Sequence, residues 1–293
     1  MADPWRISLH GGHSGEFCEH AEGTLRSVVE AAVAAGLTTF GLSEHAPRSE
    51  DRFLYPSERQ KGFNVERLQS DFDAYAAEAK TLAREFADRI DILAGFEAEV
   101  VPAAGYAGQM LAIREKYALE YMVGSVHYVD EIQIDGTLEE FHAAVAESGG
   151  IESLAVRYYE AVAEMAARLK PEVVGHLDLI RRNAPAAADL ETVAIAAAAN
   201  RALESVKESG AILDLNTAGW RKGLGNPYPA PWLVRRANEL GIGFCFGDDS
   251  HGPAQVGDGI DRARKYLLEL DVTSIRSLRR SQGGIVSTVV PLS

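Results

Sequence analysis

Short apolar runs alternate with longer amphipathic segments along the chain. Seven such runs cover Arg6–Leu9, Thr39–Ser43, Ile90–Phe96, Tyr121–Val126, Glu172–Gly175, Ala211–Leu215 and Ile242–Gly247. Each run is only a few residues long and ends in a loop, which is typical of a buried β-strand. The pattern therefore predicts seven strands distributed over the whole chain.

The segments between these runs have the 3.6-residue periodicity of helices, and two of them have recognisable ends. Thr24 is a candidate N-cap for a helix that Gly36 would close, and Asn64 is a candidate N-cap for a longer helix that reaches Phe86. Further helices are expected at Ile151–Leu169, Asp189–Ser209 and Pro231–Leu240.

The alternation of strands and helices favours an α/β fold with a parallel sheet and right-handed crossovers. A closed seven-stranded (β/α)7 barrel, related to the TIM barrel, fits better than an open sheet, because the distinctive polar residues follow the strands and strand ends share one face of a barrel. We expect residues 1–293 to form one domain. The non-periodic stretches Ala46–Phe63 and Val129–Thr137 would rim the mouth of the barrel.

The charge balance narrows the possible partners. The chain has 29 Lys plus Arg against 43 Asp plus Glu, which gives a formal net charge of -14. The average surface would repel the phosphates of a nucleic acid, so we expect no nucleic-acid partner. A small phosphorylated substrate would also be disfavoured, unless metal cations reverse the field at the site.

Neither the cysteines nor the hydropathy indicate export or membrane insertion. Cys18 and Cys245 form no CxxC pair, and no basic start followed by an apolar stretch marks a signal peptide. No window approaches the ~18 consecutive apolar residues of a membrane helix. We expect a cytoplasmic protein with no membrane partner, in which both cysteines are small buried residues rather than metal ligands.

Candidate chemistry is concentrated where the apolar runs end. Seven of the eight histidines, one glutamate and one aspartate lie at or near these positions: His10, His13, His20, His45, Glu97, His127, His176, Asp249 and His251. A single histidine of this kind is more often structural, but independent structural histidines have no reason to share strand ends. His142, inside a helical segment, receives no role. Imidazole and carboxylate donors suit zinc, manganese or iron, so the pattern predicts a polynuclear metal site.

Several motifs resemble those of the histidinol-phosphate phosphatases of the polymerase-and-histidinol-phosphatase (PHP) superfamily, and the resemblance runs over nearly the whole chain. The motifs are His20-Ala-Glu-Gly-Thr-Leu, Glu44-His45-Ala-Pro47, Gly95-Phe-Glu97-Ala, Gly124-Ser-Val-His127-Tyr128, Gly175-His176-Leu-Asp178-Leu, Asn216-Thr-Ala-Gly219 with Arg221, Tyr228-Pro-Ala-Pro231, and Gly247-Asp-Asp249-Ser-His251. Together they are highly specific. The resemblance implies a distorted seven-stranded barrel, in agreement with the strand count above.

The resemblance also implies a centre of three divalent metal ions. It assigns a first ion to His10, His13, Glu97 and Asp249, a second to Glu97, His127 and His176, and a third to His20, His45 and His251. The family normally has one residue between its first two histidines, whereas Gly11 and Gly12 separate them here. Residues three apart on a regular strand do not share a face, so we expect a glycine bulge to swing the second histidine back.

The activity that the resemblance implies is hydrolysis of L-histidinol phosphate to L-histidinol and inorganic phosphate, a step of histidine biosynthesis. A water that bridges two divalent cations ionises near neutral pH and could attack phosphorus, with Glu97 bridging the same two ions. Asp249, His251 or a metal-bound water would protonate the leaving alkoxide. Glu97, Asp249 and His251 are therefore the candidate catalytic residues.

Contacts to the rest of the substrate are less constrained by sequence. Arg221 is the first candidate for a phosphate contact, because a guanidinium donates two hydrogen bonds to phosphate oxygens, and Arg181 and Arg182 are second candidates. A surface ion pair is about as common a role for any one of these arginines. Glu131 and Asp135, in a mouth loop, could pair with the amine of the substrate.

Two other functions fit parts of the pattern. Another phosphoesterase of the superfamily, acting on nucleotides, oligonucleotides or other small phosphate esters, would use the same metal ligands, but the net acidity and the motifs favour histidinol phosphate. A non-catalytic metal-binding module belongs to a different class, and the complete ligand set disfavours it.

Overall fold

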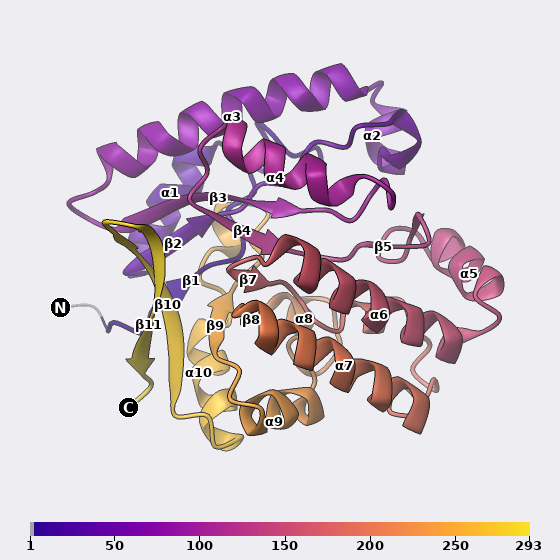
Figure 1. Cartoon of the computed structure of the whole chain (residues 1–293). Coiled ribbons are helices and arrows are strands. Elements are labelled where there is room, and N and C mark those ends of the chain that lie inside the picture. The colour runs from indigo at the N-terminus through magenta and orange to yellow at the C-terminus, as the bar shows by residue number, and fades with distance from the viewer. Residues whose placement is uncertain (1–2) are drawn as a thin grey trace.

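The structure of the protein, a computed structural model, describes residues 3–293 and is built around seven parallel strands (Figure 1). The strands are β1 (Ile7–Ser8), β2 (Thr39–Leu42), β3 (Asp91–Ala98), β4 (Tyr121–Gly124), β7 (Val173–Val174), β8 (Ile212–Asn216) and β9 (Phe244–Gly247), and they neighbour one another in this order. Every neighbouring pair is parallel. All seven strands coincide with the apolar runs of the sequence.

The sheet curls until its first and last strands meet. The backbone N–H of Leu9, directly after β1, donates to the carbonyl of Phe246 in β9 at 2.8 Å. The N–H of Asp249 donates to the carbonyl of His10 at 2.9 Å. These bonds draw the strands into a nearly closed α/β barrel, which confirms the predicted fold class. The carboxyl ends of the parallel strands therefore gather at one mouth.

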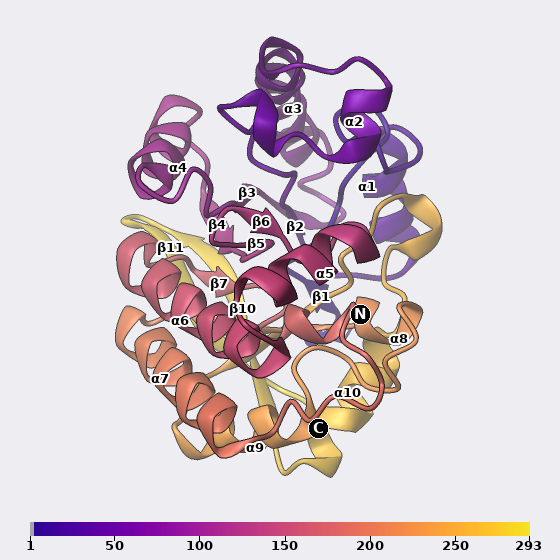
Figure 2. The same cartoon turned by 90° about the vertical axis from the view of Figure 1, so that its right-hand side faces the viewer.

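Helices cover the outside of the barrel, as Figures 1 and 2 show from two sides. They are α1 (Leu25–Ala34), α3 (Val65–Glu85), α4 (Tyr106–Lys116), α5 (Leu138–Glu147), α6 (Ile151–Leu169), α7 (Val193–Ser209), α9 (Pro231–Glu239) and α10 (Ile260–Glu269), with the short helices α2 (Pro56–Gln60) and α8 (Ala218–Arg221). Thr24 caps α1 and Asn64 caps α3, as predicted. Helices α6 and α7 lie side by side and form the most extensive contact between two helices.

Some elements differ from those expected. Helix α7 begins at Val193 with Thr192 as its cap, so the predicted start at Asp189 was wrong. The sequence pattern did not identify α4 or α10, and it gave no bounds for α5, the helical segment that contains His142. It also missed two hairpins, β5 (Tyr128–Val129) with β6 (Ile132–Gln133), and β10 (Ser274–Ser281) with β11 (Gly284–Pro291). The second hairpin packs its first strand beside β9.

The interior of the barrel is filled by large side chains, among which Tyr121 of β4 is fully buried. Its hydroxyl donates to the carbonyl of Leu9 at 3.0 Å, across the barrel. Gly41 in β2 and Gly95 in β3 make room for the ring, since a Cβ at either glycine would lie 2.2 Å from a Tyr121 atom. Among residues 3–293, no helix combines the length and the apolar character that a membrane crossing requires.

Candidate metal centre

A cavity of about 590 Å³ opens at the mouth of the barrel. The predicted ligands that line it are His20, His45, Glu97, His127, His176, Asp249 and His251. His10 and His13 are fully buried beside this lining. As expected, the two mouth loops contribute to the wall, with Tyr55, Pro56, Ser57, Gln60, Gln133, Asp135, Gly136 and Thr137. The structure therefore brings the nine widely separated candidates together.

Glu97 is at the centre of this cluster. It lies within β3 rather than after it, and its Oε1 is 3.2 Å from Nε2 of His10, 3.2 Å from Nε2 of His176 and 3.4 Å from Nε2 of His127. Its Oε2 is 2.9 Å from Nδ1 of His45. One carboxylate thus faces four imidazoles from four segments of the chain, an arrangement suited to a bridging ligand.

Three buried carboxylates hold the outer nitrogens of the histidine rings. The Nδ1 atoms pair as His10 with Asp214 at 2.7 Å, His13 with Glu44 at 2.9 Å and His127 with Glu99 at 2.8 Å. Such a partner fixes the orientation and tautomer of a ring and leaves Nε2 free to bind a metal ion. Sequence reasoning did not identify these carboxylates. The one signal for them was a charged residue, Asp214, inside an apolar strand.

Several ring nitrogens in the cluster have no hydrogen-bond partner of good geometry. They include the buried Nε2 atoms of His10, His13 and His45. Burying an unpaired polar nitrogen is unfavourable unless a ligand satisfies it. Two groups have ligand atoms that all lie within 4.8 Å of one another: His10, Glu97 and His176, and His10, His13 and Asp249. This donor chemistry fits divalent zinc, manganese or iron.

The glycine pair turns the chain between the first two histidines. Gly11 has φ of 144° and Gly12 has φ of 79°, both in the region that favours glycine. The turn brings His13 into the same group as His10, as the sequence analysis expected for a distorted strand end. A Cβ on Gly12 would lie 2.8 Å from the side chain of Leu42, so there is no room for a larger residue at this position.

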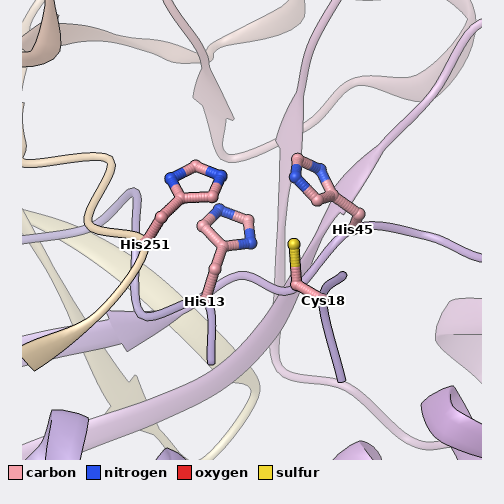
Figure 3. A group of neighbouring side chains, drawn as sticks. All are labelled: His13, Cys18, His45 and His251. Atoms are coloured by element: carbon pink, nitrogen blue, oxygen red, sulfur yellow. The ribbon is translucent and has the colours of Figure 1, made fainter. Parts of the chain in front are cut away.

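A third group contains a residue that the sequence analysis set aside. Its members are His13, Cys18, His45 and His251, whose ligand atoms also lie within 4.8 Å of one another (Figure 3). His20, which the resemblance assigned to the third ion, lies beside this group, and its ring nitrogens are 3.4 and 3.6 Å from the sulfur of Cys18. Cys18 is buried, as expected, but it is also placed among potential ligands.

Opposite charges at the centre shift the pKa values of its residues. Burial alone would raise the pKa of Glu97, but His10 and His127 lower it well below the ordinary value. Burial alone would lower the pKa of His127, but Glu99 and Glu97 raise it to about 10. The carboxylates therefore stabilise positive charge at this position, which is the environment that a bound cation requires.

Two of the three arginines predicted to bind phosphate line the cavity, and the third does not. Arg221 and Arg182 line the cavity. Arg221 also donates to the carbonyl of Asp249 at 3.0 Å and so holds the loop that carries this residue. Arg181 does not line the cavity, because its guanidinium pairs with Asp178 at 2.9 Å. Arg221 and Arg182 are therefore the better placed of the three arginines for a phosphate contact.

Of the two acidic residues suggested for the substrate amine, only Asp135 lines the cavity. Asp135 lines the cavity and pairs with Arg182 at 3.2 Å. Glu131 does not line the cavity. Its carboxylate accepts hydrogen bonds from Arg52 at 2.6 Å and from the backbone N–H of Ala103 at 3.0 Å. Lys222, which sequence reasoning missed, lines the cavity as well.

Comparisons with known proteins agree with this site. The PHP domain family model matches residues 10–218. A Schizosaccharomyces pombe protein named "Probable histidinol-phosphatase" is 35% identical over 95% of this chain and 91% of its own length. The histidinol-phosphatase of Saccharomyces cerevisiae is 30% identical over 93% of this chain and 92% of its own length.

A crystal structure of histidinol phosphate phosphatase from Lactococcus lactis, complexed with zinc, L-histidinol and phosphate, has the same fold. Its TM-score is 0.72, at 20% identity, with 93% of this chain and 96% of that chain covered. The fold, the clustered ligands and the sequence relatives agree, and the chain therefore belongs to the PHP domain family, among the histidinol-phosphatases.

Proposed function

We propose that this protein hydrolyses L-histidinol phosphate to L-histidinol and inorganic phosphate, the activity for which its fungal relatives are named. The observation that carries the proposal is the contact of Glu97 with four histidine rings beside a cavity of about 590 Å³. Sites for small molecules are roughly 300–1,000 Å³, so the cavity suits a small phosphorylated metabolite.

Divalent metal ions are part of the proposal. His10, His13, Glu97 and Asp249 would hold a first ion, Glu97, His127 and His176 a second, and His20, His45 and His251 a third. When bound, such ions supply an activated water for attack on phosphorus and neutralise the phosphoryl oxygens. The unpaired Nε2 atoms and the compact donor groups support this assignment. The donor types favour zinc, manganese or iron.

The leaving oxygen of the alcohol must receive a proton. Asp249 and His251 have no free proton when they hold ions, so a water that these two residues position at the cavity wall would supply it. Asn216 donates to Oδ2 of Asp249 at 3.3 Å and restrains the carboxylate. Nδ1 of His251 lies 3.0 Å from the carbonyl of Asp249, which turns the other ring nitrogen away from the loop. General acid catalysis requires a positioned group of this kind.

The wall of the cavity offers complementary charges for the rest of the substrate. Arg221 and Arg182 would contact phosphate oxygens. Asp135 would pair with the substrate amine. Burial alone would raise the pKa of Asp135, but His127 and Arg182 lower it, so the carboxylate is ionised at neutral pH. Arg181 and Glu131 are not part of this proposal, because their side chains lie outside the cavity lining.

One assay separates this function from its alternatives. Release of inorganic phosphate is measured with histidinol phosphate, a nucleoside monophosphate and a phosphodiester, before and after chelation. We expect turnover of histidinol phosphate that chelation abolishes and that added zinc, manganese or iron restores. Turnover of the diester alone would overturn the proposal in favour of another phosphoesterase, and no turnover by the fully metal-loaded protein would favour a binding module.

A further inference from the structure

A buried ion pair anchors the mouth loop Ala46–Phe63. Arg48, near the start of the loop, pairs with Glu58 of α2, and the two side chains are only 4% and 5% exposed. Glu58 also accepts a hydrogen bond at 2.7 Å from the backbone N–H of Tyr55, the residue before α2. In Figure 1, α2 lies at the same end of the molecule as β5 and α5. The ion pair therefore ties α2 to the start of the loop, at the mouth of the barrel.

The contribution of this pair is geometric rather than a gain in stability. Taking two charges out of water is costly, and apolar side chains of similar volume are often as stable or more stable in their place. A guanidinium, however, has a rigid planar shape. Cζ of Arg48 lies 4.3 Å from the centroid of the Tyr55 ring, within the range of a cation–π contact. Arg48 thus holds α2 through Glu58 and holds Tyr55 through the face of its ring.

Tyr55 forms the side of the cavity next to the candidate ligands. Its ring meets those of His20 and His45 edge to face, with centroids 5.7 and 6.2 Å apart. The residues that line the cavity on this side are Tyr55, Pro56, Ser57 and Gln60. We call these four residues the α2 wall. Phosphate oxygens would bind at the metal ligands, so the organic part of the substrate would extend along the α2 wall toward the mouth.

We propose that Arg48 is a positioning residue that sets the affinity for the histidinol part of the substrate. Arg48 does not line the cavity itself, and it acts by holding Tyr55 and α2 in place. Without it, the α2 wall moves outward and its contacts with the histidinol part weaken. The phosphate end keeps its contacts, because other segments of the chain supply them. This inference rests on the proposed function and names a residue that determines its substrate selectivity.

Product inhibition tests the two ends of the substrate separately. Inorganic phosphate probes the metal end and L-histidinol probes the α2 wall, and each inhibits turnover of histidinol phosphate by the metal-loaded enzyme. For Arg48→Met we expect the Ki for L-histidinol and the KM for histidinol phosphate to rise about 10-fold, the usual order for lost pocket contacts. The kcat and the Ki for phosphate should stay within about twofold of the wild type, since only binding shared by ground state and transition state is lost.

A second variant keeps the test valid if the first does not fold. Arg48→Met leaves the carboxylate of Glu58 buried without a partner, which is strongly destabilising. The double variant Arg48→Met/Glu58→Gln removes both charges and should show the same change in the Ki for L-histidinol. The hydroxyl of Tyr128 donates to the carbonyl of Phe53 at 2.8 Å, so the loop stays attached to the barrel in both variants.

The matched control is Arg114→Met. It breaks a partly buried pair with Glu172, at 2.7 Å, before the start of β7 and so at the opposite end of the barrel from the cavity. Both inhibition constants should be those of the wild type. Arg48 variants whose Ki for L-histidinol is unchanged, or whose Ki for phosphate rises equally, overturn the inference and leave the proposed function intact. Failure of both Arg48 variants to fold assigns the pair to stability and also overturns it. No turnover by the metal-loaded wild type overturns the proposed function and the inference together.

Discussion

Glu97 is the residue on which the centre depends most, because its two oxygens contact rings that arrive from four segments of the chain. Without this carboxylate, positive charge on the rings of His10 and His127 would lose a nearby negative partner. Two metal ions held close together would also lose a shared ligand. Glu97 would therefore both balance the positive charge of the site and hold two ions close together.

We expect Glu97→Ala and, separately, His127→Ala to abolish phosphate release from histidinol phosphate while the chain stays folded. Loss of a second-sphere partner already costs about 10- to 100-fold in metal affinity or activity, so loss of a direct ligand should cost more than about 100-fold. Activity and circular dichroism are measured together. Glu164→Ala, at an exposed position on α6, is the control that should retain activity. Full activity in either ligand variant would contradict the assignment.

Asp214 should act through His10 rather than on the substrate. Its Oδ2 pairs with Nδ1 of His10 at 2.7 Å, and both side chains are fully buried. We expect Asp214→Asn to weaken metal binding by about 10- to 100-fold, because the amide no longer holds the ring with a charge. Competition with a chelator of known affinity measures the change. Asp261→Asn removes an exposed carboxylate and should leave metal affinity unchanged. Equal affinities in the two variants would exclude the positioning role of Asp214.

The sequence could identify the nine candidate ligands because histidine is rare and its recurrence at strand ends is improbable by chance. It could not identify Asp214, Glu44 and Glu99, since carboxylates are common and their role depends on which ring each one faces. Cys18 was set aside for a similar reason. A lone thiol has no pattern in the sequence, and only the folded chain places it beside His13 and His45.

At the level of elements, the apolar runs predicted every barrel strand because strands buried on both faces are continuously apolar. The hairpin of β10 and β11 escaped detection because it is packed on one side and exposed on the other, with arginines and serines among its apolar residues. The start of α7 was misplaced because Asp189 and Thr192 are both good caps, and only the structure shows that Thr192 accepts the hydrogen bond from Ile195.

The packing of β3 against β4 depends on the absence of a side chain at Gly95. A Cβ there would lie 2.2 Å from the ring of Tyr121 and 2.7 Å from its carbonyl oxygen. The ring is fully buried, so it has no space to move away. We expect Gly95→Ala to destabilise the protein by about 3 kcal/mol, the upper end of the usual cost of overpacking a core.

Chemical denaturation measures this change, and α4 provides a matched control. A Cβ at Gly108 meets no atom within 4 Å, and the residue lies inside the helix. Gly108→Ala should therefore stabilise the protein by about 0.5–1 kcal/mol, the usual gain when alanine replaces glycine in a helix. Equal stability of the two variants would show that β3 and β4 can separate to accommodate the methyl group.

At the level of the whole molecule, an acidic surface surrounds a centre that should attract phosphate. The net charge of -14 repels a phosphorylated substrate at long range. Arg182, Arg221 and Lys222 provide positive charge on the cavity wall, and bound cations would add more. The metal ions would therefore reverse the field where the substrate binds, in addition to their part in the chemistry.

The candidate ligands follow almost every strand of the barrel, so metal binding should stabilise the whole barrel rather than one part of it. We propose that the chain is one domain, in keeping with its one continuous hydrophobic core. A metal ion at about 100 times its Kd adds about 2.7 kcal/mol of stability, or roughly 5 °C in Tm for a large domain. Calorimetry of chelated and zinc-loaded protein should show one cooperative transition in each, at a higher temperature with zinc. Two separate transitions, only one of them sensitive to zinc, would contradict a single domain.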